Sequence, residues 1–281
     1  MIAFFLVSLL IAWRPLVETF ALALHDDEYT HILLILPISG VLIFLEWRSL
    51  REWIAPDVRI GTGLLLAAVT MACCARFGSV SPEPDVQLFI TMAALVLSWV
   101  GAFVFWFGTR ASRSVLFPLA FLFGLVPIPR PALDRVISLL QLGSAWAAHA
   151  LFSVMGVPVD QAGVFLTIPG LTVQVAQECS SIRSSSMLLV TTIVLAQLLL
   201  RSPWRKVVVI VVAVPLSIAK NGLRIWTIAM LGTRVDPGYL TGRLHHQGGI
   251  LFFAVALLGI FALLWILRRN EDLSLKPGLN P

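Results

Sequence analysis

The sequence predicts an all-α integral membrane protein, and its composition and the distribution of its charges support that prediction. Of the 281 residues, 58% are hydrophobic and 12% are charged, and the mean hydropathy is +0.92. Soluble domains carry about 25% charged residues, so this composition excludes an ordinary soluble domain. The net charge of +5 comes from basic residues in short clusters between apolar runs. Such clusters indicate membrane topology and argue against a nucleic-acid partner.

Eight apolar runs are long enough to cross a bilayer, which takes about 20 helical residues. The first run has no basic n-region before it, so we expect a first span and not a cleavable signal peptide. We expect one polytopic membrane domain over residues 1–270 and a polar C-terminal tail over 271–281. The eight expected spans are 2–24, 32–47, 60–76, 86–107, 114–128, 182–200, 207–232 and 249–267.

Four groups of basic residues fall in loops on the same side of such an eight-span chain. The positive-inside rule makes that side cytoplasmic, which also places both termini in the cytoplasm. The groups are Arg48, Arg51 and Arg59; Arg110 and Arg113; Arg201, Arg205 and Lys206; and Arg268, Arg269 and Lys276.

Two segments between the fifth and sixth runs need a separate interpretation. Segment 132–156 is apolar enough to cross, but it carries polar residues at roughly helical spacing. We expect an amphipathic helix at the interface, because a crossing there would move the later basic clusters out of the cytoplasm. After it, Val164 to Gln174 contains two β-prone stretches around Pro169-Gly170, which predict a short extracytoplasmic β-hairpin.

A polar cluster at residues 177–186 opens the sixth run and is the predicted active site. Cys179 falls near the expected start of a helix, and Arg183 follows one turn later. A helix N-terminus and a guanidinium both favour a thiolate, whereas the neighbouring Glu178 opposes it.

The other two cysteines suggest no chemistry. Cys73 and Cys74 are adjacent within an apolar run, where we expect them to pack as small apolar residues. Cys179 is far from both in the sequence, so we expect a free thiol there.

Two more polar features fall on the same predicted side as Cys179. Asn221 and Arg224 lie in the outer part of the seventh run, and His245 and His246 precede the last one. An arginine there must face protein or snorkel to the interface. A histidine that takes the thiol proton, a thiolate that attacks a carbonyl and a cation that stabilises the oxyanion would perform acyl transfer. The solvation of helix ends explains the same residue types equally well.

Five short motifs, spread over nearly the whole chain, add a resemblance to these observations. They are Asp27-Glu28-Tyr29-Thr30-His31 with Pro37; Phe117-Pro118 with Pro127-Ile128-Pro129; Cys179-Ser180-Ser181-Ile182-Arg183; Asn221-Gly222-Leu223-Arg224-Ile225; and His245 with Gly249 and Phe253. Together they resemble the motifs of the exosortase/archaeosortase family of multi-pass membrane cysteine transpeptidases. Thr30 and Ser181 depart from that pattern, which has serine and glycine there. Archaeal members carry an arginine in place of the histidine, so His245 points to the bacterial exosortase branch.

The resemblance implies an enzyme of the bacterial inner membrane with its active site on the extracytoplasmic side. Its substrates would be exported proteins with C-terminal sorting signals of the PEP-CTERM kind, made of a short motif, a transmembrane helix and a basic tail. Cleavage through a thioester acyl-enzyme would transfer the new C-terminus to an acceptor, which could be linked to exopolysaccharide or lipid. The matching motif positions imply a role for each site residue. Cys179 would be the nucleophile, Arg224 the oxyanion-stabilising or substrate-orienting cation and His245 the acid/base. Arg183 and Asn221 would be supporting residues.

Two other functions fit the same residues. A hydrolytic intramembrane cysteine protease would use water as the acceptor, and a transporter or lipid-binding protein would line its substrate path with Arg224. We expect membrane lipid as a partner, and no cofactor, metal or nucleic acid. His25, Asp26 and Asp27 fit solvated loop residues better than metal ligands, and His31 fits a residue that hydrogen-bonds a loop.

Overall fold

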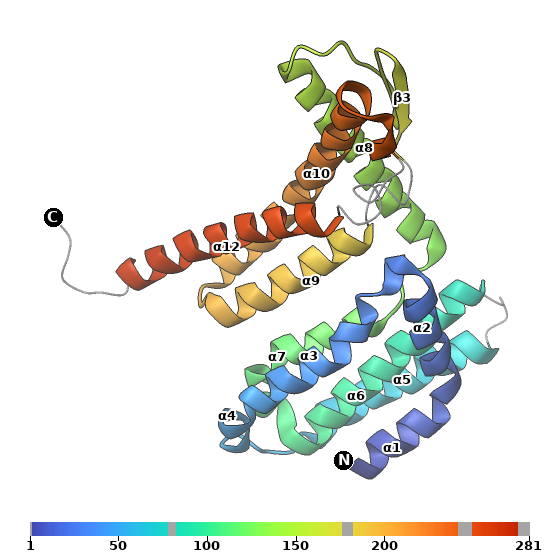
Figure 1. Cartoon of the computed structure of the whole chain (residues 1–281). Helices are drawn as coiled ribbons and strands as arrows, with labels where there is room; N and C mark the ends of the chain where they lie inside the picture. The colour runs from blue at the N-terminus through green and yellow to red at the C-terminus, as the bar shows by residue number, and fades with distance from the viewer. Residues whose placement is uncertain (1, 78–82, 176–181, 241–248, 275–281) are drawn as a thin grey trace. The chain divides into compact units, whose positions relative to one another are not determined.

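A computed structural model describes residues 2–77, 83–175, 182–240 and 249–274. Within these ranges, seven helices are long and apolar enough to cross a membrane, or eight if a bent N-terminal pair counts as one span. The chain forms two compact units, Met1–Leu133 and Asp134–Pro281 (Figure 1). The predicted class, an all-α membrane protein with a small β element, is confirmed.

The first unit is entirely helical in its described part. The two longest helices, α5 and α6, pack along each other, and α3 packs on α7 and η2. In chain order its elements are α1 (Ile2–Ile11), α2 (Trp13–His25), η1 (Asp27–Tyr29), α3 (Ile32–Leu45), α4 (Trp47–Arg51), α5 (Val58–Phe77), α6 (Pro84–Ser114), α7 (Leu116–Phe121) and η2 (Leu122–Leu125).

The first two helices give the expected span over 2–24 a sharp bend, which hydropathy did not predict. Their axes differ by 73° at a break next to Ala12. Pro15, in the first turn of α2, has no N–H to donate to the carbonyl of Ile11, and its ring crowds that carbonyl. The helix therefore breaks although the run of apolar residues continues.

The expected fifth span over 114–128 is also shorter than predicted. Only α7 and the 3-10 turn η2 are helical there, and Pro127 and Pro129 follow directly. These prolines remove two main-chain donors and force an extended path before the next helix begins.

The second unit has three long helices that pack on one another, α9, α10 and α12 (Figure 1). A small sheet packs on the fourth long helix, α8, and on α10. Its elements are α8 (Arg130–Val154), β1 (Asp160–Ala162), β2 (Phe165–Ile168), β3 (Leu171–Gln174), α9 (Ile182–Leu199), α10 (Pro203–Arg234), η4 (Pro237–Leu240) and α12 (Gly249–Ser274). α8 begins at the end of the first unit. It is one of the helices with the length and composition of a span, so the interfacial position expected for 132–156 stays a prediction.

The predicted hairpin is confirmed, and a third strand extends it. β2 and β3 pair antiparallel, and Ile168 faces Leu171 across a two-residue loop. Gly170 in that loop has a φ of +83°, a conformation that glycine adopts without a steric penalty. β1 pairs with the other edge of β2, so the strand order is β1-β2-β3. Its sequence, Asp-Gln-Ala, has no β-propensity that could have predicted it.

α10 joins two hydrophobic cores. Its N-terminal half packs through Val209 and Ala213 on α9 and α12. Its C-terminal half packs through Ile225 and Ala229 on α8 and the sheet. The polar residues of α10 lie between these two cores, where apolar packing alone does not cover the helix.

A buried carboxylate fixes the far end of the second unit. Glu271 is 6% exposed and accepts main-chain N–H bonds from Arg201 (3.0 Å) and Ser202 (2.8 Å), which precede α10. Arg205 donates to the carbonyl of Leu267 at 2.7 Å and lies 3.9 Å from Glu271. α12 runs on to Ser274, so the expected polar tail begins as part of this helix.

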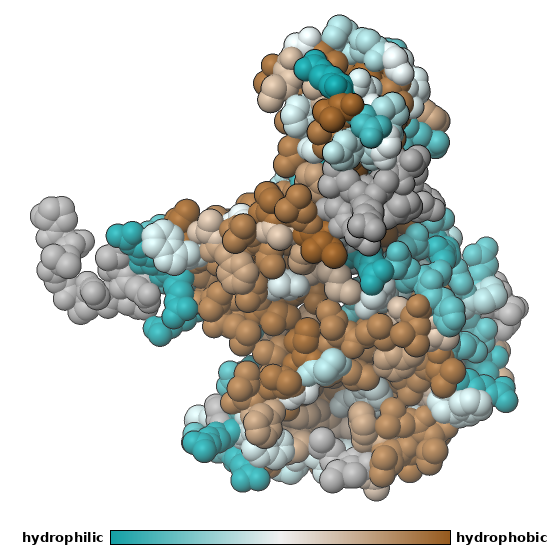
Figure 2. Space-filling model, in the orientation of Figure 1, coloured by the Kyte–Doolittle hydropathy of each residue, from teal (hydrophilic) through white to brown (hydrophobic). Residues whose placement is uncertain are grey.

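The long helices present apolar side chains on their outer surfaces (Figure 2). Phe44 on α3 is 76% exposed and Leu258 on α12 is 68% exposed. Apolar surface of this extent would make a soluble protein aggregate, and it is what a lipid bilayer covers.

Candidate active site

The structure describes three of the five predicted site residues. Arg183, Asn221 and Arg224 lie in described helices, whereas Cys179 and His245 lie outside the described residues. β3 ends at Gln174 and α9 begins at Ile182, so described elements stand on both sides of the segment that holds Cys179.

A buried polar stripe runs along α10 between its two cores. It consists of Ser217, Lys220, Asn221 and Arg224, whose relative exposures are 4%, 5%, 1% and 8%. Spacings of three, four and seven residues place them on one face of the helix. Because Arg224 is buried, snorkelling to the interface does not describe it; its side chain faces protein.

The serines that follow Cys179 supply partners for this stripe. The Lys220 ammonium donates to the hydroxyl of Ser184, and the Ser217 hydroxyl donates to that of Ser185 at 2.6 Å. Both serines lie in the first turn of α9. These bonds join α9 to the middle of α10, and sequence reasoning missed them although Ser184 to Ser186 stood out as a polar run.

Asn221 binds a third helix, α8. Its side-chain N–H donates to the hydroxyl of Ser144 at 3.0 Å, and Ser144 donates in turn to the carbonyl of Leu140 at 2.6 Å. The next residue must be glycine, because a Cβ at Gly222 would lie 2.5 Å from the Cβ of Ala147. The close approach of α10 to α8 is what lets the asparagine reach its serine.

Arg224 lines a cavity of about 240 Å³ between α10 and the sheet. The opposite wall is β3, from Leu171 to Gln174, and Ile228 and Leu240 contribute apolar surface. Arg224 is the only charged residue among the described residues that line it. A carbonyl oxygen or an anion bound in this cavity would lie next to the guanidinium of Arg224.

Arg183 differs from the stripe residues of α10 in its exposure. It is exposed in the first turn of α9, whereas its neighbours Ser184 and Ser185 face α10. The predicted support of Arg183 for the thiolate stays a prediction.

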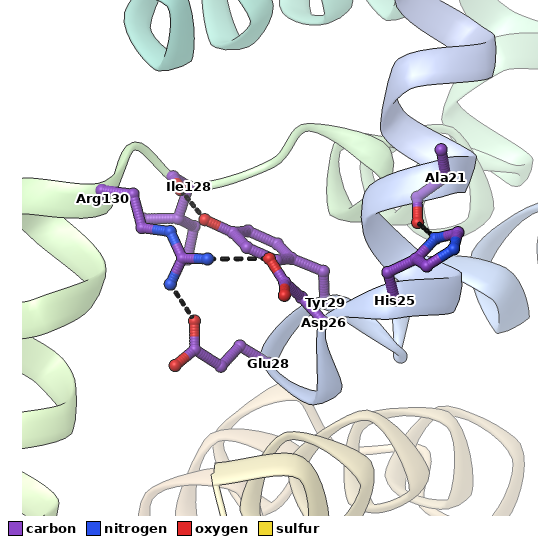
Figure 3. Close-up of polar contacts among 7 residues, drawn as sticks. All are labelled: Ala21, His25, Asp26, Glu28, Tyr29, Ile128 and Arg130. Carbon is purple, nitrogen blue, oxygen red and sulfur yellow. Dashed lines mark hydrogen bonds and ion pairs between the residues drawn. The ribbon is translucent and has the colours of Figure 1, made fainter. Parts of the chain in front are cut away.

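The first two motifs meet in the first unit (Figure 3). The Tyr29 hydroxyl donates to the carbonyl of Ile128 at 2.8 Å. Arg130 binds Asp26 at 2.7 Å and Glu28 at 2.6 Å, and its guanidinium lies 5.7 Å from the centre of the Tyr29 ring. Arg130 is 42% exposed, so each ion pair contributes about 1 kcal/mol or less. Asp26 is thus an ion-pair partner, which corrects its interpretation as a merely solvated residue.

The comparison with known protein families agrees with these motifs. The family model described as transmembrane exosortase (Exosortase_EpsH) matches residues 21–262. Searches of curated proteins and of solved structures found no match to the chain. The match contains all the motifs and spans most of both units, which gives the chain a general role as a membrane transpeptidase in protein sorting. The chain belongs to the transmembrane exosortase family.

Proposed function

We propose that this protein is a cysteine transpeptidase that cleaves C-terminal sorting signals of the PEP-CTERM kind from exported proteins and transfers the new C-terminus to an acceptor. One observation carries the proposal most directly. The buried guanidinium of Arg224 lines a cavity whose other wall, β3, ends five residues before Cys179 in the sequence. A guanidinium in this cavity would stabilise the oxyanion that forms on a peptide carbonyl bound beside Cys179.

The first half-reaction forms a thioester. His245 takes the proton of the Cys179 thiol, and the sulfur attacks the scissile carbonyl carbon, so that a C–S bond forms and the carbonyl electrons move to oxygen. Arg224 stabilises this oxyanion. When the intermediate collapses, the C–N bond breaks and His245 gives its proton to the leaving amine. The transmembrane helix and the basic tail of the signal leave with that amine.

The second half-reaction regenerates the enzyme. The acceptor nucleophile loses its proton to His245 and attacks the thioester carbonyl, and the thiolate of Cys179 leaves. An acceptor linked to exopolysaccharide or lipid gives transpeptidation, and water gives hydrolysis. Asn221 holds α10 against α8 and in this way positions Arg224.

In this proposal the active site lies on the extracytoplasmic side of a bacterial inner membrane. The four basic clusters support a cytoplasmic position for both termini, and an odd number of crossings before α9 would place its N-terminal end outside. An exported substrate reaches that side after translocation, while its transmembrane helix still lies in the bilayer.

The decisive experiment follows a co-encoded protein that ends in a short motif, an apolar helix and a basic tail. In cells with the wild-type enzyme, we expect this substrate to lose its signal and to gain the mass of an acceptor. Cys179→Ala should abolish the conversion, because no other residue of the site supplies a thiolate. Cys73→Ala and Cys74→Ala are the matched controls, since both cysteines are exposed on the surface of α5.

Each other outcome has a defined meaning. A product that gains only water identifies a hydrolytic protease. Conversion by Cys179→Ala at the wild-type rate would end the cysteine mechanism.

A further inference from the structure

The outer edge of β3 carries main-chain N–H and C=O groups that form no hydrogen bond with another described strand. β3 is the last strand in the order β1-β2-β3, so among the described residues it pairs only with β2. The N–H of Val175 donates to the carbonyl of Val164 at 2.9 Å, which marks these two residues as a hydrogen-bonded pair. Hydrogen-bonded pairs alternate along an antiparallel ladder. Leu171 and Val173 therefore point their main-chain groups at β2, whereas Thr172 and Gln174 point theirs at the outer edge.

The two faces of β3 differ in the same regular way. Leu171 and Val173 stand opposite Ile168 and Leu166, which are buried against α8 and α10. Thr172 and Gln174 point to the exposed face. A strand added beside β3 would thus alternate as well, with every second side chain directed toward α10.

The cavity lies where those inward side chains would go. Its walls are β3 on one side and Arg224, Ile225, Ile228 and Ala229 of α10 on the other. It combines apolar surface with one guanidinium, which suits a peptide that inserts alternate side chains and presents its backbone carbonyls nearby. A lipid chain would use the apolar walls but would leave the main-chain groups of the β3 edge without partners.

We infer that the sorting-signal segment of the substrate binds as an extended strand on the outer edge of β3, with its main chain paired to Thr172 and Gln174 and its alternate side chains in the cavity. This inference rests on the proposed function. Strand addition fixes the register of a peptide through its main chain, while the cavity selects side chains at alternate positions. Since β3 leads toward Cys179 in the sequence, the same pairing would align the scissile bond.

The first test uses proline at matched positions on the two edges of the sheet. Thr172→Pro removes an outward N–H from β3, and its ring blocks an added strand, but it breaks no main-chain hydrogen bond to β2. Its only loss toward β2 among the described residues is the exposed contact between the hydroxyls of Thr172 and Thr167, at 3.4 Å. Gln161→Pro is the equivalent change on β1, because Gln161 points its main chain away from β2 by the same alternation. We expect Thr172→Pro to weaken binding of the co-encoded substrate to the Cys179→Ala enzyme by about tenfold. Gln161→Pro should leave it unchanged.

The second test places the added strand directly. In full-length enzyme that carries Cys73→Ala, Cys74→Ala and Cys179→Ala, we introduce Thr172→Cys and scan single cysteines through the motif of the substrate. Cross-links should form at every second substrate residue, since alternate side chains share a face. The control is Thr167→Cys. Thr167 lies on β2, directly opposite Thr172 and on the same face of the sheet, so β3 separates it from the added strand. We expect no cross-link from this position.

The outcomes separate this inference from the proposed function. Normal cleavage by an otherwise wild-type Thr172→Pro enzyme would overturn strand addition and leave the transpeptidase intact. Cross-links without periodicity, or equal cross-linking at Thr167, would overturn it too. Disulfide-linked dimers of the Thr172→Cys enzyme without substrate would assign the edge to a second copy of the chain. If the wild type fails to cleave while the periodic cross-links appear, the proposed function fails and the peptide site stands.

Discussion

Replacing Arg224 by lysine separates the geometry of its guanidinium from its charge. The side chain is 8% exposed in the middle of α10 and lines the cavity next to β3. Lysine keeps the charge and most of the apolar stem, but an ammonium cannot reproduce the planar fork. The loss of one oxyanion donor costs about 2.7–4 kcal/mol in other acyl-transfer enzymes. We therefore expect thioester formation to slow by about 100-fold or more in Arg224→Lys.

The assay is single-turnover cleavage of the signal-bearing substrate by purified enzyme over a range of substrate concentrations. A lower maximal rate at an unchanged half-saturating concentration indicates a transition-state contact; a higher half-saturating concentration at an unchanged rate indicates substrate orientation. Arg234→Lys is the matched control, because Arg234 is an exposed arginine at the end of the same helix. Wild-type kinetics in Arg224→Lys would refute both roles, and a large fall in its thermal midpoint would assign Arg224 to folding instead.

Three more predictions concern the histidine of the last motif, the buried Glu271 and the side of the membrane on which Cys179 lies. His245→Ala should lose far more activity than His246→Ala, because only His245 has the motif spacing to Gly249; equal losses would refute that register. Glu271→Ala should lower the thermal midpoint by about 5 °C and Glu271→Gln by less, since alanine leaves two part-buried N–H groups without their acceptor; an unchanged midpoint for alanine would contradict this. In intact spheroplasts, an impermeant maleimide should label Cys179 increasingly as the pH rises, because the thiolate reacts; labelling only after permeabilisation would invert the predicted topology.

Hydropathy and turn chemistry were enough to predict much of the second unit. The expected span over 182–200 matches α9, and the loop at Pro169-Gly170 matches the turn between β2 and β3. Both features depend on local sequence, since a long apolar run must form a helix in lipid and a Pro-Gly pair favours a turn. For the same reason the motif positions of Asn221 and Arg224 could be found without a structure.

The features that the sequence did not reveal depend on single residues or on long-range contacts. An average over an apolar run does not register the missing N–H of Pro15, so the bend between α1 and α2 went unpredicted. The bond between Tyr29 and Ile128 spans 99 residues, and no local pattern pairs Arg130 with Asp26. Only the resemblance to family motifs gave a reason to expect both segments to matter.

The buried stripe of α10 combines a structural demand with the catalytic role that we propose for Arg224. An unpartnered polar group in hydrocarbon is costly, so Lys220 and Asn221 must face α9 and α8, and their partners fix the rotation of the whole helix. That rotation directs Arg224 into the cavity beside β3. Ser144→Ala would therefore reduce cleavage without touching substrate, and Ser144→Thr, which keeps a hydroxyl, should recover part of the rate. An equal loss in both variants would mean that packing against Ala147, and not the hydrogen bond of Asn221, sets the position of Arg224.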